Sequence, residues 1–260
     1  MADTWYTLES SNISGFEEGN FLGDKGGFSE LVNSFMGKAV QIYGDRITNT
    51  PVSVRAIIQN VTADTPANAD QRQILTEIGK LQCGQYIKFD NRWWLVVSLV
   101  DNNMVYEKAV IWYCNYIVKF KAPGTSNEVT YPVVSNNATQ YNSGIESNKT
   151  MTVGSTQRLL YVPYNAVTVE VDHDFRLLVD RRVSKPTAYI VTQVDTEQFD
   201  YDGYGVLRWT LVEDTLRTTD DLAKMIADNT PTGEIDSEDD GLGWIDIPVE
   251  EDEGEGGGVI

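Results

Sequence analysis

The alternation of apolar and polar residues is strongest between residues 84 and 120, and the rest of the chain is organised around this stretch. Apolar residues within 86–89 precede Asp90 and Asn91, and the apolar run 93–100 follows. A strand, a tight turn and a second strand account for this order most simply. Residues 104–120 continue with β-branched and aromatic side chains, which suit a half-buried pleated surface. The pattern predicts a hairpin at Asp90 and further strands after it.

The same plan recurs later in the chain. Residues 89–97 read FDNRWWLVV, and residues 179–192 read VDRRVSKPTAYIVT, with an insertion at 183–187. Each copy is expected to close with an aromatic strand, at 115–120 in the first and 205–211 in the second. We therefore predict a mainly β chain with two related small antiparallel β-barrels or sandwiches. The alternative is that any two hairpins with an Asp turn look alike.

A few short helices are predicted from apolar residues at helical spacing. The first lies within 27–44, where Gly37 weakens it by about 1 kcal/mol relative to Ala. The second spans 70–79 and ends at Gly79. The third spans 218–229, with acidic residues near its start.

Strands outside the central hairpin are predicted by alternation and by β-branched residues. Pro132 favours an edge position for its strand, because proline cannot donate to a ladder. The predicted strands are 52–58, 128–134, 151–153 and 158–162.

The length of 260 residues allows one large β-domain or two of ordinary size. The predicted organisation has four parts. They are an extended N-terminal arm (1–26), a first β-domain with a helix and an inserted loop (27–121), a second β-domain (122–216), and a short helix with an acidic, Gly-rich tail (217–260).

The net charge of −19 disfavours a sequence-independent grip on nucleic acid, which needs Lys and Arg to replace phosphate counterions. Residues 234–255 hold eleven acidic residues and no basic one. The predicted folded body is therefore only moderately acidic.

Candidate chemistry is sparse in this sequence. His173 is the only histidine, and no Gly-x-Ser-x-Gly elbow accompanies it. Cys83 and Cys114 lack the spacing of a zinc site and are expected to be reduced, packed thiols. The acidic 199–203 loop does not have EF-hand spacing. We predict a non-enzymatic protein without a metal or cofactor, although paired carboxylates are not visible in a sequence.

Aromatic residues are the main candidates for contact with other proteins. Adjacent strand residues point to opposite faces, so one member of the 93–94 pair and one of the 112–113 pair should face outward. The N-terminal arm has aromatic residues to bury against a neighbouring subunit, and the 135–147 loop is expected to project. The candidate interface residues are Trp5, Tyr6, Phe16, Phe21, Trp93, Trp112, Asn137, Tyr141 and Trp244.

Several segments resemble virion structural proteins of tailed phages. They read RQILTEIG, GQYI, WLVV, YEKA and CNY, at residues 72–79, 84–87, 94–97, 106–109 and 114–116. The likeness covers roughly residues 51–214 and leaves both ends unassigned. Residues 84–100 are also similar to the small β-barrel of head-closure and neck proteins.

The resemblance implies a structural role at the head-to-tail connector. It implies a homo-oligomeric ring, of about six or twelve copies, between a portal or adaptor protein and a tail or tail-terminator protein. DNA would pass through the lumen without specific binding, past an acidic lining that lets it slide. The implied location is the virion, assembled in the host cytoplasm. No membrane partner is expected, because no apolar run approaches the roughly 20 residues of a membrane span.

Two other functions remain open at this point. One is a tail-tip or baseplate adaptor, or a carbohydrate-binding module, that uses Trp93, Trp94 or the 136–147 loop. The other is an enzyme of unrecognised type, which would need a deep polar pocket with perturbed carboxylates.

Overall fold

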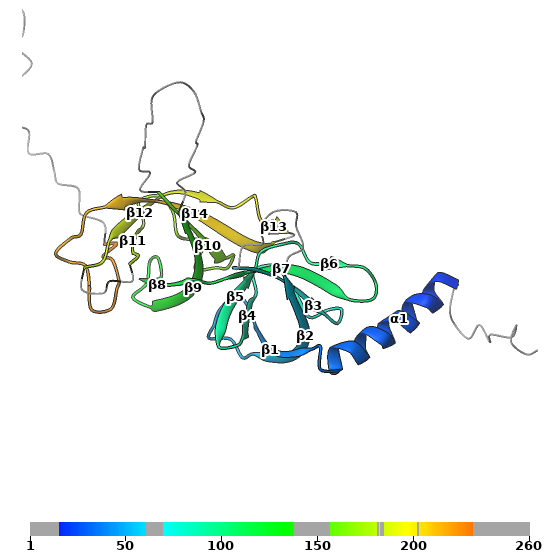
Figure 1. The fold of residues 1–260 in the computed structure, drawn as a ribbon. Coiled ribbons are helices and arrows are strands. Elements are labelled where there is room, and N and C mark those ends of the chain that lie inside the picture. The colour runs from blue at the N-terminus through cyan, green and yellow to red at the C-terminus, as the bar shows by residue number, and fades with distance from the viewer. Residues whose placement is uncertain are drawn as a thin grey trace, which may run out of the picture. The chain divides into compact units, whose positions relative to one another are not determined.

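The computed structural model describes residues 16–60, 70–137, 157–180, 182, 185–201 and 203–230, with the backbone alone for residues 16–23 (Figure 1). The described residues from 16 to 229 belong to one compact unit. This unit consists of one helix, α1 (Phe16–Asn33), and two β-sheets. In the part of the chain that the structure describes, no helix is long and apolar enough to cross a membrane.

The first sheet is a closed antiparallel barrel. Its order is β3-β2-β1-β4-β5-β7-β6, and the additional pairing of β3 with β7 closes it. Its strands are β1 (Lys38–Tyr43), β2 (Val52–Asn60), β3 (Gln71–Thr76), β4 (Tyr86–Phe89), β5 (Arg92–Val96), β6 (Asp101–Asn102) and β7 (Glu107–Tyr113).

The second sheet is a nearly closed barrel of order β11-β12-β14-β10-β9-β8, with β13 paired to β14. Its end strands β8 and β11 lie side by side. Its strands are β8 (Tyr116–Lys121), β9 (Glu128–Asn137), β10 (Arg158–Pro163), β11 (Arg176–Leu178), β12 (Ala188–Asp195), β13 (Asp200–Tyr201) and β14 (Tyr204–Asp214). The predicted mainly β fold of two barrel-like sheets is confirmed.

The two barrels share one strand order, which shows that the predicted repeat is real. Around the first barrel the order is β1-β2-β3-β7-β5-β4, and around the second it is β8-β9-β10-β14-β12-β11. The short strands β6 and β13 pair with β7 and β14, the equivalent members of the two barrels. The predicted closing strand at 115–120 is wrong, because β8 begins the second sheet and β7 is the equivalent of β14. The second sheet thus starts before residue 122, where the second domain was expected to begin.

The continuous apolar run after Asn91 arises because β5 is buried on both faces. Trp94 and Val96 point into the core of the first barrel. Trp93, Leu95 and Val97 point to the other side, into a core shared with the second sheet. Strands covered on both faces lose the alternation that marks a half-exposed strand. Strand β5 therefore contributes side chains both to the core of the first barrel and to the junction with the second.

The predicted turn between β4 and β5 is confirmed in its detail. Asp90 and Asn91 both have positive φ, 49° and 57°, as a two-residue type I′ hairpin requires. Replacing Asn91 with Val should lower the free energy of unfolding by about 1–3 kcal/mol, because a β-branched residue is strained at positive φ. Asn91→Gly should stay within about 0.5 kcal/mol of the parent. Urea denaturation checks both variants, and equal midpoints for Val and Gly would contradict this account.

Two predicted helices in the first part of the chain are wrong: one lies at other residues, and the other is a strand. The helix expected within 27–44 is α1, which begins at Phe16 within the expected extended arm and ends at Asn33. Residues 38–43 form β1, because Val40 and Ile42 alternate into the first core. Residues 71–76 form β3 instead of a helix, since pairing with both β2 and β7 outweighs their helical spacing.

The helix predicted at 218–229 is also absent. Those residues form turns and a single bridge between Asp221 and Ile226. Met225 has φ of 59°, which a right-handed helix does not permit, and the Asp220 carboxylate accepts backbone hydrogen bonds from Arg217 and Asp228. These local bonds replace a helical ladder.

The edge position predicted from Pro132 is wrong for the strand as a whole. β9 lies between β8 and β10, and its register with β10 stops at Val134. Pro132 therefore has a paired strand, β8, on one side only. On its other side no strand is paired with it, so no backbone N–H is required there. The strand predicted at 151–153 lies outside the described residues.

Candidate functional site at the junction of the two barrels

The junction between the barrels is an aromatic contact built on β7. The Trp112 ring packs edge-on against Tyr161 of β10, with centroids 5.0 Å apart, and against Phe199 at 6.5 Å. Next to it the Tyr86 hydroxyl donates a hydrogen bond of 2.6 Å to the carbonyl of Pro132. Both barrels thus contribute side chains to one continuous core.

Trp93 also faces this junction, and side chains of the same chain pack against its ring. Tyr43 packs edge-on at 4.8 Å and Tyr86 at 6.1 Å, and the Lys88 ammonium lies 5.0 Å above the ring. A sugar-stacking platform needs an open ring face, and the Lys88 contact covers one face of Trp93. The contacts that the structure shows for Trp93 and Trp112 are within the chain.

The other candidate interface residues lie at the edges of the described regions. Asn137 is exposed at the end of β9. Phe16 and Phe21 are on α1, in the segment described by its backbone alone. Trp5, Tyr6, Tyr141 and Trp244 lie outside the described residues. That all of these residues contact a partner stays a prediction.

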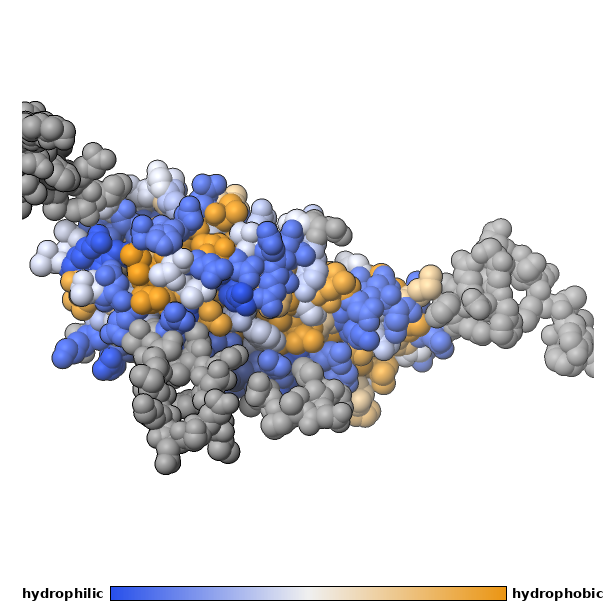
Figure 2. All heavy atoms as spheres, turned by 90° about the horizontal axis from the view of Figure 1, so that it is seen from above, coloured by the Kyte–Doolittle hydropathy of each residue, from blue (hydrophilic) through white to orange (hydrophobic). Residues whose placement is uncertain are grey.

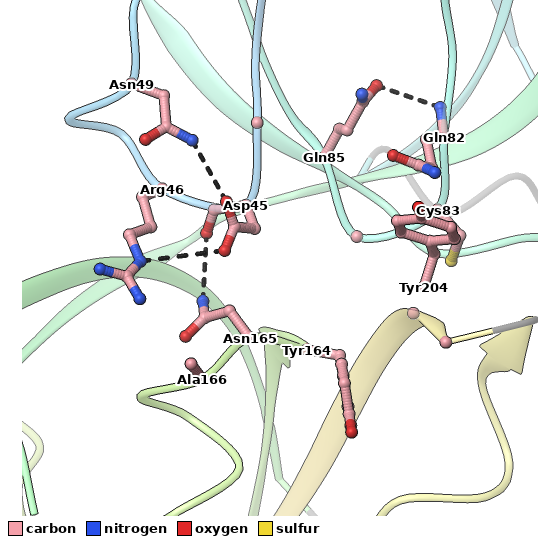
Figure 3. A pocket seen from close by; sticks show the side chains of 14 residues that line it. Asp45, Arg46, Asn49, Gln82, Cys83, Gln85, Tyr164, Asn165, Ala166 and Tyr204 are labelled. Atoms are coloured by element: carbon pink, nitrogen blue, oxygen red, sulfur yellow. Dashed lines mark hydrogen bonds and ion pairs between the residues drawn. The ribbon is translucent and has the colours of Figure 1, made fainter.

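A pocket of about 540 Å³ with both polar and apolar lining opens beside the junction (Figure 3). Asp45, one of the lining residues, accepts two hydrogen bonds: the Asn49 amide donates to its carboxylate at 3.2 Å, and the Asn165 amide donates to its backbone carbonyl at 3.4 Å. Arg46 pairs with the same carboxylate at 3.8 Å. The remaining lining includes Gln82, Cys83, Gln85, Tyr164 and Tyr204. The pocket offers amide, phenol and backbone groups for hydrogen bonds.

Two glycines permit close backbone contacts at this pocket, Gly84 between the two barrels and Gly205 within the second barrel. Gly84 has φ of +81°, and a Cβ there would lie 2.3 Å from the carbonyl oxygen of Gly205. A Cβ on Gly205 would lie 2.1 Å from the carbonyl of Phe199. The role of Gly84 was not predicted, because a close approach between distant segments leaves no local signal.

The two thiols of the junction are poorly suited to act as nucleophiles. Burial raises the pKa of Cys83 to about 12, and burial raises the pKa of Cys114 even further. Because the thiolate is the reactive form, both thiols should resist a disulfide reagent at pH 8 in the folded protein and react fully in denaturant. Absorbance with a chromogenic disulfide measures this directly. Rapid modification of either thiol in the folded state would show that the junction opens.

The carboxyl groups whose pKa is shifted are held by arginines. Hydrogen bonds from Arg182 lower the pKa of Asp180 strongly. Burial disfavours the ionised forms of Asp195 and Asp214, but hydrogen bonds and the charges of Arg208 and Arg176 outweigh it and lower both pKa values. A lowered pKa keeps a carboxylate ionised, which suits an ion pair better than a general acid.

Other candidate chemistry does not gather into a site. The His173 ring is exposed and lies 2.8 Å from Asp174. Among the residues that the structure describes, no group of three or more His, Cys, Asp or Glu side chains could hold a metal ion.

The sequence analysis missed the buried ion cluster at the end of the second barrel. Arg176 is 1% exposed and pairs with Asp214 at 2.6 Å and Asp220 at 2.8 Å. Its guanidinium also donates to the carbonyls of Thr215 and Asp228. A single arginine beside the apolar residues of a three-residue strand was the available signal.

Exposed apolar side chains gather where α1 meets β1. Leu31 is 44% exposed, Phe35 94% and Met36 48%. Figure 2 shows that hydrophobic side chains on the face in view form several separate groups among hydrophilic ones. Exposed apolar groups of this kind mark contact surfaces when they are contiguous.

Residues 10–113 match the sequence model of the YomX N-terminal domain, a phage-type family. The match ends at Tyr113, the last residue of β7, and so it spans the first barrel. It supports the coarser part of the resemblance, namely a phage-related protein. No curated protein matches the chain.

Three solved structures of one protein are similar to this chain at low identity. One is described as MrkH, a c-di-GMP-dependent transcription regulatory factor, with 9% identity, a TM-score of 0.22, and coverage of 79% of this chain and 87% of that one. Another is K. pneumonia MrkH with c-di-GMP, with 8% identity, a TM-score of 0.22, and coverage of 78% and 90%. TM-scores this low do not establish a shared fold.

Proposed function

We propose that this chain is a non-enzymatic structural protein of a phage particle and forms a ring in the head-to-tail connector. The observation that carries the proposal is the pair of barrels with one strand order, fused through a shared core. Such a body can serve as a building block, and one repeated heterologous contact between identical blocks generates a ring when the rotation closes. The match to a phage-type family supports the setting.

The state of the ionisable groups supports a structural role over a catalytic one. The shifted carboxyls are bound to arginines, and the thiols are buried and neutral. These groups stabilise the ionised pairs or the core, whereas catalysis at neutral pH needs groups that exchange protons readily.

In this proposal the ring joins the portal or an adaptor above to a tail protein below. A net charge of −19 fits a channel that repels DNA and lets it slide without specific binding. The protein is then a component of the virion and is assembled in the host cytoplasm.

Localised cryo-electron microscopy of the intact particle tests this function. The expected result is a ring of density directly below the portal into which the two barrels fit. Density at the distal tail would overturn the connector position and favour the adaptor alternative. Absence of the chain from purified particles would overturn the structural role altogether.

A further inference from the structure

The two barrels are equivalent residue by residue in their central hairpins. Ile87 pairs with Trp94 across β4 and β5, and Leu177 pairs with Tyr189 across β11 and β12. All four side chains are buried inside their own barrels. The equivalence therefore identifies the outward-pointing residues of the second barrel that correspond to the outward-pointing residues of the first.

Each hairpin and its neighbouring strand present an outward row of three residues in the same register. In the first barrel this row is covered by the second barrel. In the second barrel the equivalent row is partly covered by the chain that follows β14. The rows, in matching order, are Tyr86, Leu95 and Trp112 in the first barrel and Arg176, Ile190 and Val212 in the second.

The covering of the second row is a short segment, residues 215–229, which we name the C-terminal cap. Arg176 bonds to its carbonyls and to Asp220, and the Asn229 side chain bonds to both backbone groups of Arg176. Apolar contact is small: Ala227 and Met225 pack on Leu178 and Ala188. Within this row the C-terminal cap contacts Arg176, and it also covers the neighbouring Leu178 and Ala188 on the same side of the hairpin.

The first barrel shows the same replacement of a barrel by a terminal segment, on its β2-β3 side. The strand register gives the equivalence on this side. It runs from β7 through β3 to β2 in the first barrel and from β14 through β10 to β9 in the second, and it makes Arg55 of β2 the equivalent of Pro132 of β9. The Pro132 carbonyl is bonded to the first barrel. Arg55 instead donates to the carbonyls of Val32 and Ser34, at 2.9 and 2.6 Å, and to that of Gly37. Residues 16–37, which we name the N-terminal cap, therefore occupy the face that docks in the other barrel.

The N-terminal cap is held by few contacts. The Phe28 ring packs against Tyr106 in a tilted arrangement with centroids 4.9 Å apart, the Ser29 hydroxyl donates to Glu77, and Val32 is 2% exposed. The helix contains four glycines, and each costs about 1 kcal/mol relative to alanine. A helix of this composition depends on its docking contacts and is suited to exchange one partner for another.

We propose that the two capped faces are a second copy of the intramolecular junction, made between chains. With the caps displaced, the β11-β12-β14 face of one copy receives the β2-β3 face of the next. Arg176 then loses Asp220 but keeps its ion pair with Asp214 of β14 where it approaches Arg55 of the next copy. Terminal caps have this role in repeat proteins, where they block further stacking. The contact would be heterologous and would repeat around the proposed ring, and it rests on the proposed function for its biological setting.

Full-length variants that release one cap each test this contact. Val32→Asp places a charge under the N-terminal cap, and Ala227→Arg places one under the C-terminal cap. Each variant alone keeps one face covered and should remain monomeric. Their mixture should form a 1:1 complex of twice the monomer mass in light scattering at about 100 µM, because one exposed face meets its complement. Leu31→Asp and Leu222→Arg change exposed neighbours, and their mixture should stay monomeric.

Further variants keep the test decisive. Val212→Glu added to Ala227→Arg should abolish the complex, and a complex that survives this change would overturn the assigned face. If circular dichroism shows that Ala227→Arg is unfolded, Asn229→Ala releases the cap more gently by removing two hydrogen bonds to Arg176. A mixture of folded variants that stays monomeric would overturn the contact, even where microscopy places a ring below the portal. If the mixture forms the complex but microscopy shows no density at the neck, the contact between chains is supported and the connector function is overturned.

Discussion

Replacing Asp220 with Ala should lower the free energy of unfolding by about 3–5 kcal/mol, one of the two largest effects expected in this chain. The carboxylate is buried and pairs with the Arg176 guanidinium at 2.8 and 3.1 Å. Removing it leaves a buried cation short of a partner, and the N–H groups of Arg217 and Asp228 lose their acceptor. Urea denaturation followed by tryptophan fluorescence measures the change.

Asp221→Ala is the matched control, because the neighbouring carboxylate is exposed. Its only side-chain bond that the structure shows is to the backbone of Lys224, so a change within about 1 kcal/mol is expected. Equal destabilisation by the two substitutions would contradict a special role for the Arg176 cluster.

The same cluster predicts how stability depends on pH. Burial opposes ionisation of Asp220 and Asp214, but the hydrogen bonds from Arg176 outweigh it and lower both pKa values. The stabilisation is therefore fully present above the unfolded-state pKa of about 4 and is lost as the pH falls through the folded-state values. Asp220→Ala should flatten the loss of stability between about pH 4 and pH 2. An unchanged acid profile would show that other groups dominate it.

The parts of the fold that could be predicted are those fixed by neighbouring residues. The Asp90 turn is confirmed because positive φ at two successive residues is a local property that Asp and Asn tolerate. The repeat was visible for the same reason, since both hairpins carry an Asp between apolar runs. The strand at 71–76 was missed because its two ladders join segments far apart in the sequence.

The candidate site was predictable in kind but not in place. Alternation correctly separated Trp93 from Trp94, yet the outward member faces the second barrel. A sequence shows which side of a strand a residue occupies, but it does not show whether another layer covers that side. Arg176 illustrates the same limit, because its partners include Asp220 and Asp228, which lie in the segment 218–229 that was predicted to be a helix.

Replacing Leu95 with Ala should lower the free energy of unfolding by about 2–5 kcal/mol and should weaken both barrels together. Leu95 belongs to β5 of the first barrel, is 0% exposed, and lies in the core that contains Trp209 of the second. A cavity at this point removes contacts from both sides of the junction. Arg92→Ala, on the exposed end of the same strand, is the control and should cost less than about 1 kcal/mol.

Hydrogen exchange of the Leu95→Ala variant then distinguishes one folding unit from two. Because the buried core runs without interruption from Tyr86 to Leu211, amides of β5 and of β14 should lose protection by the same free energy. Loss confined to the first barrel would show that the barrels unfold separately and that their contact contributes little. A shared loss is expected if the residues of the junction form one core with the interiors that they join.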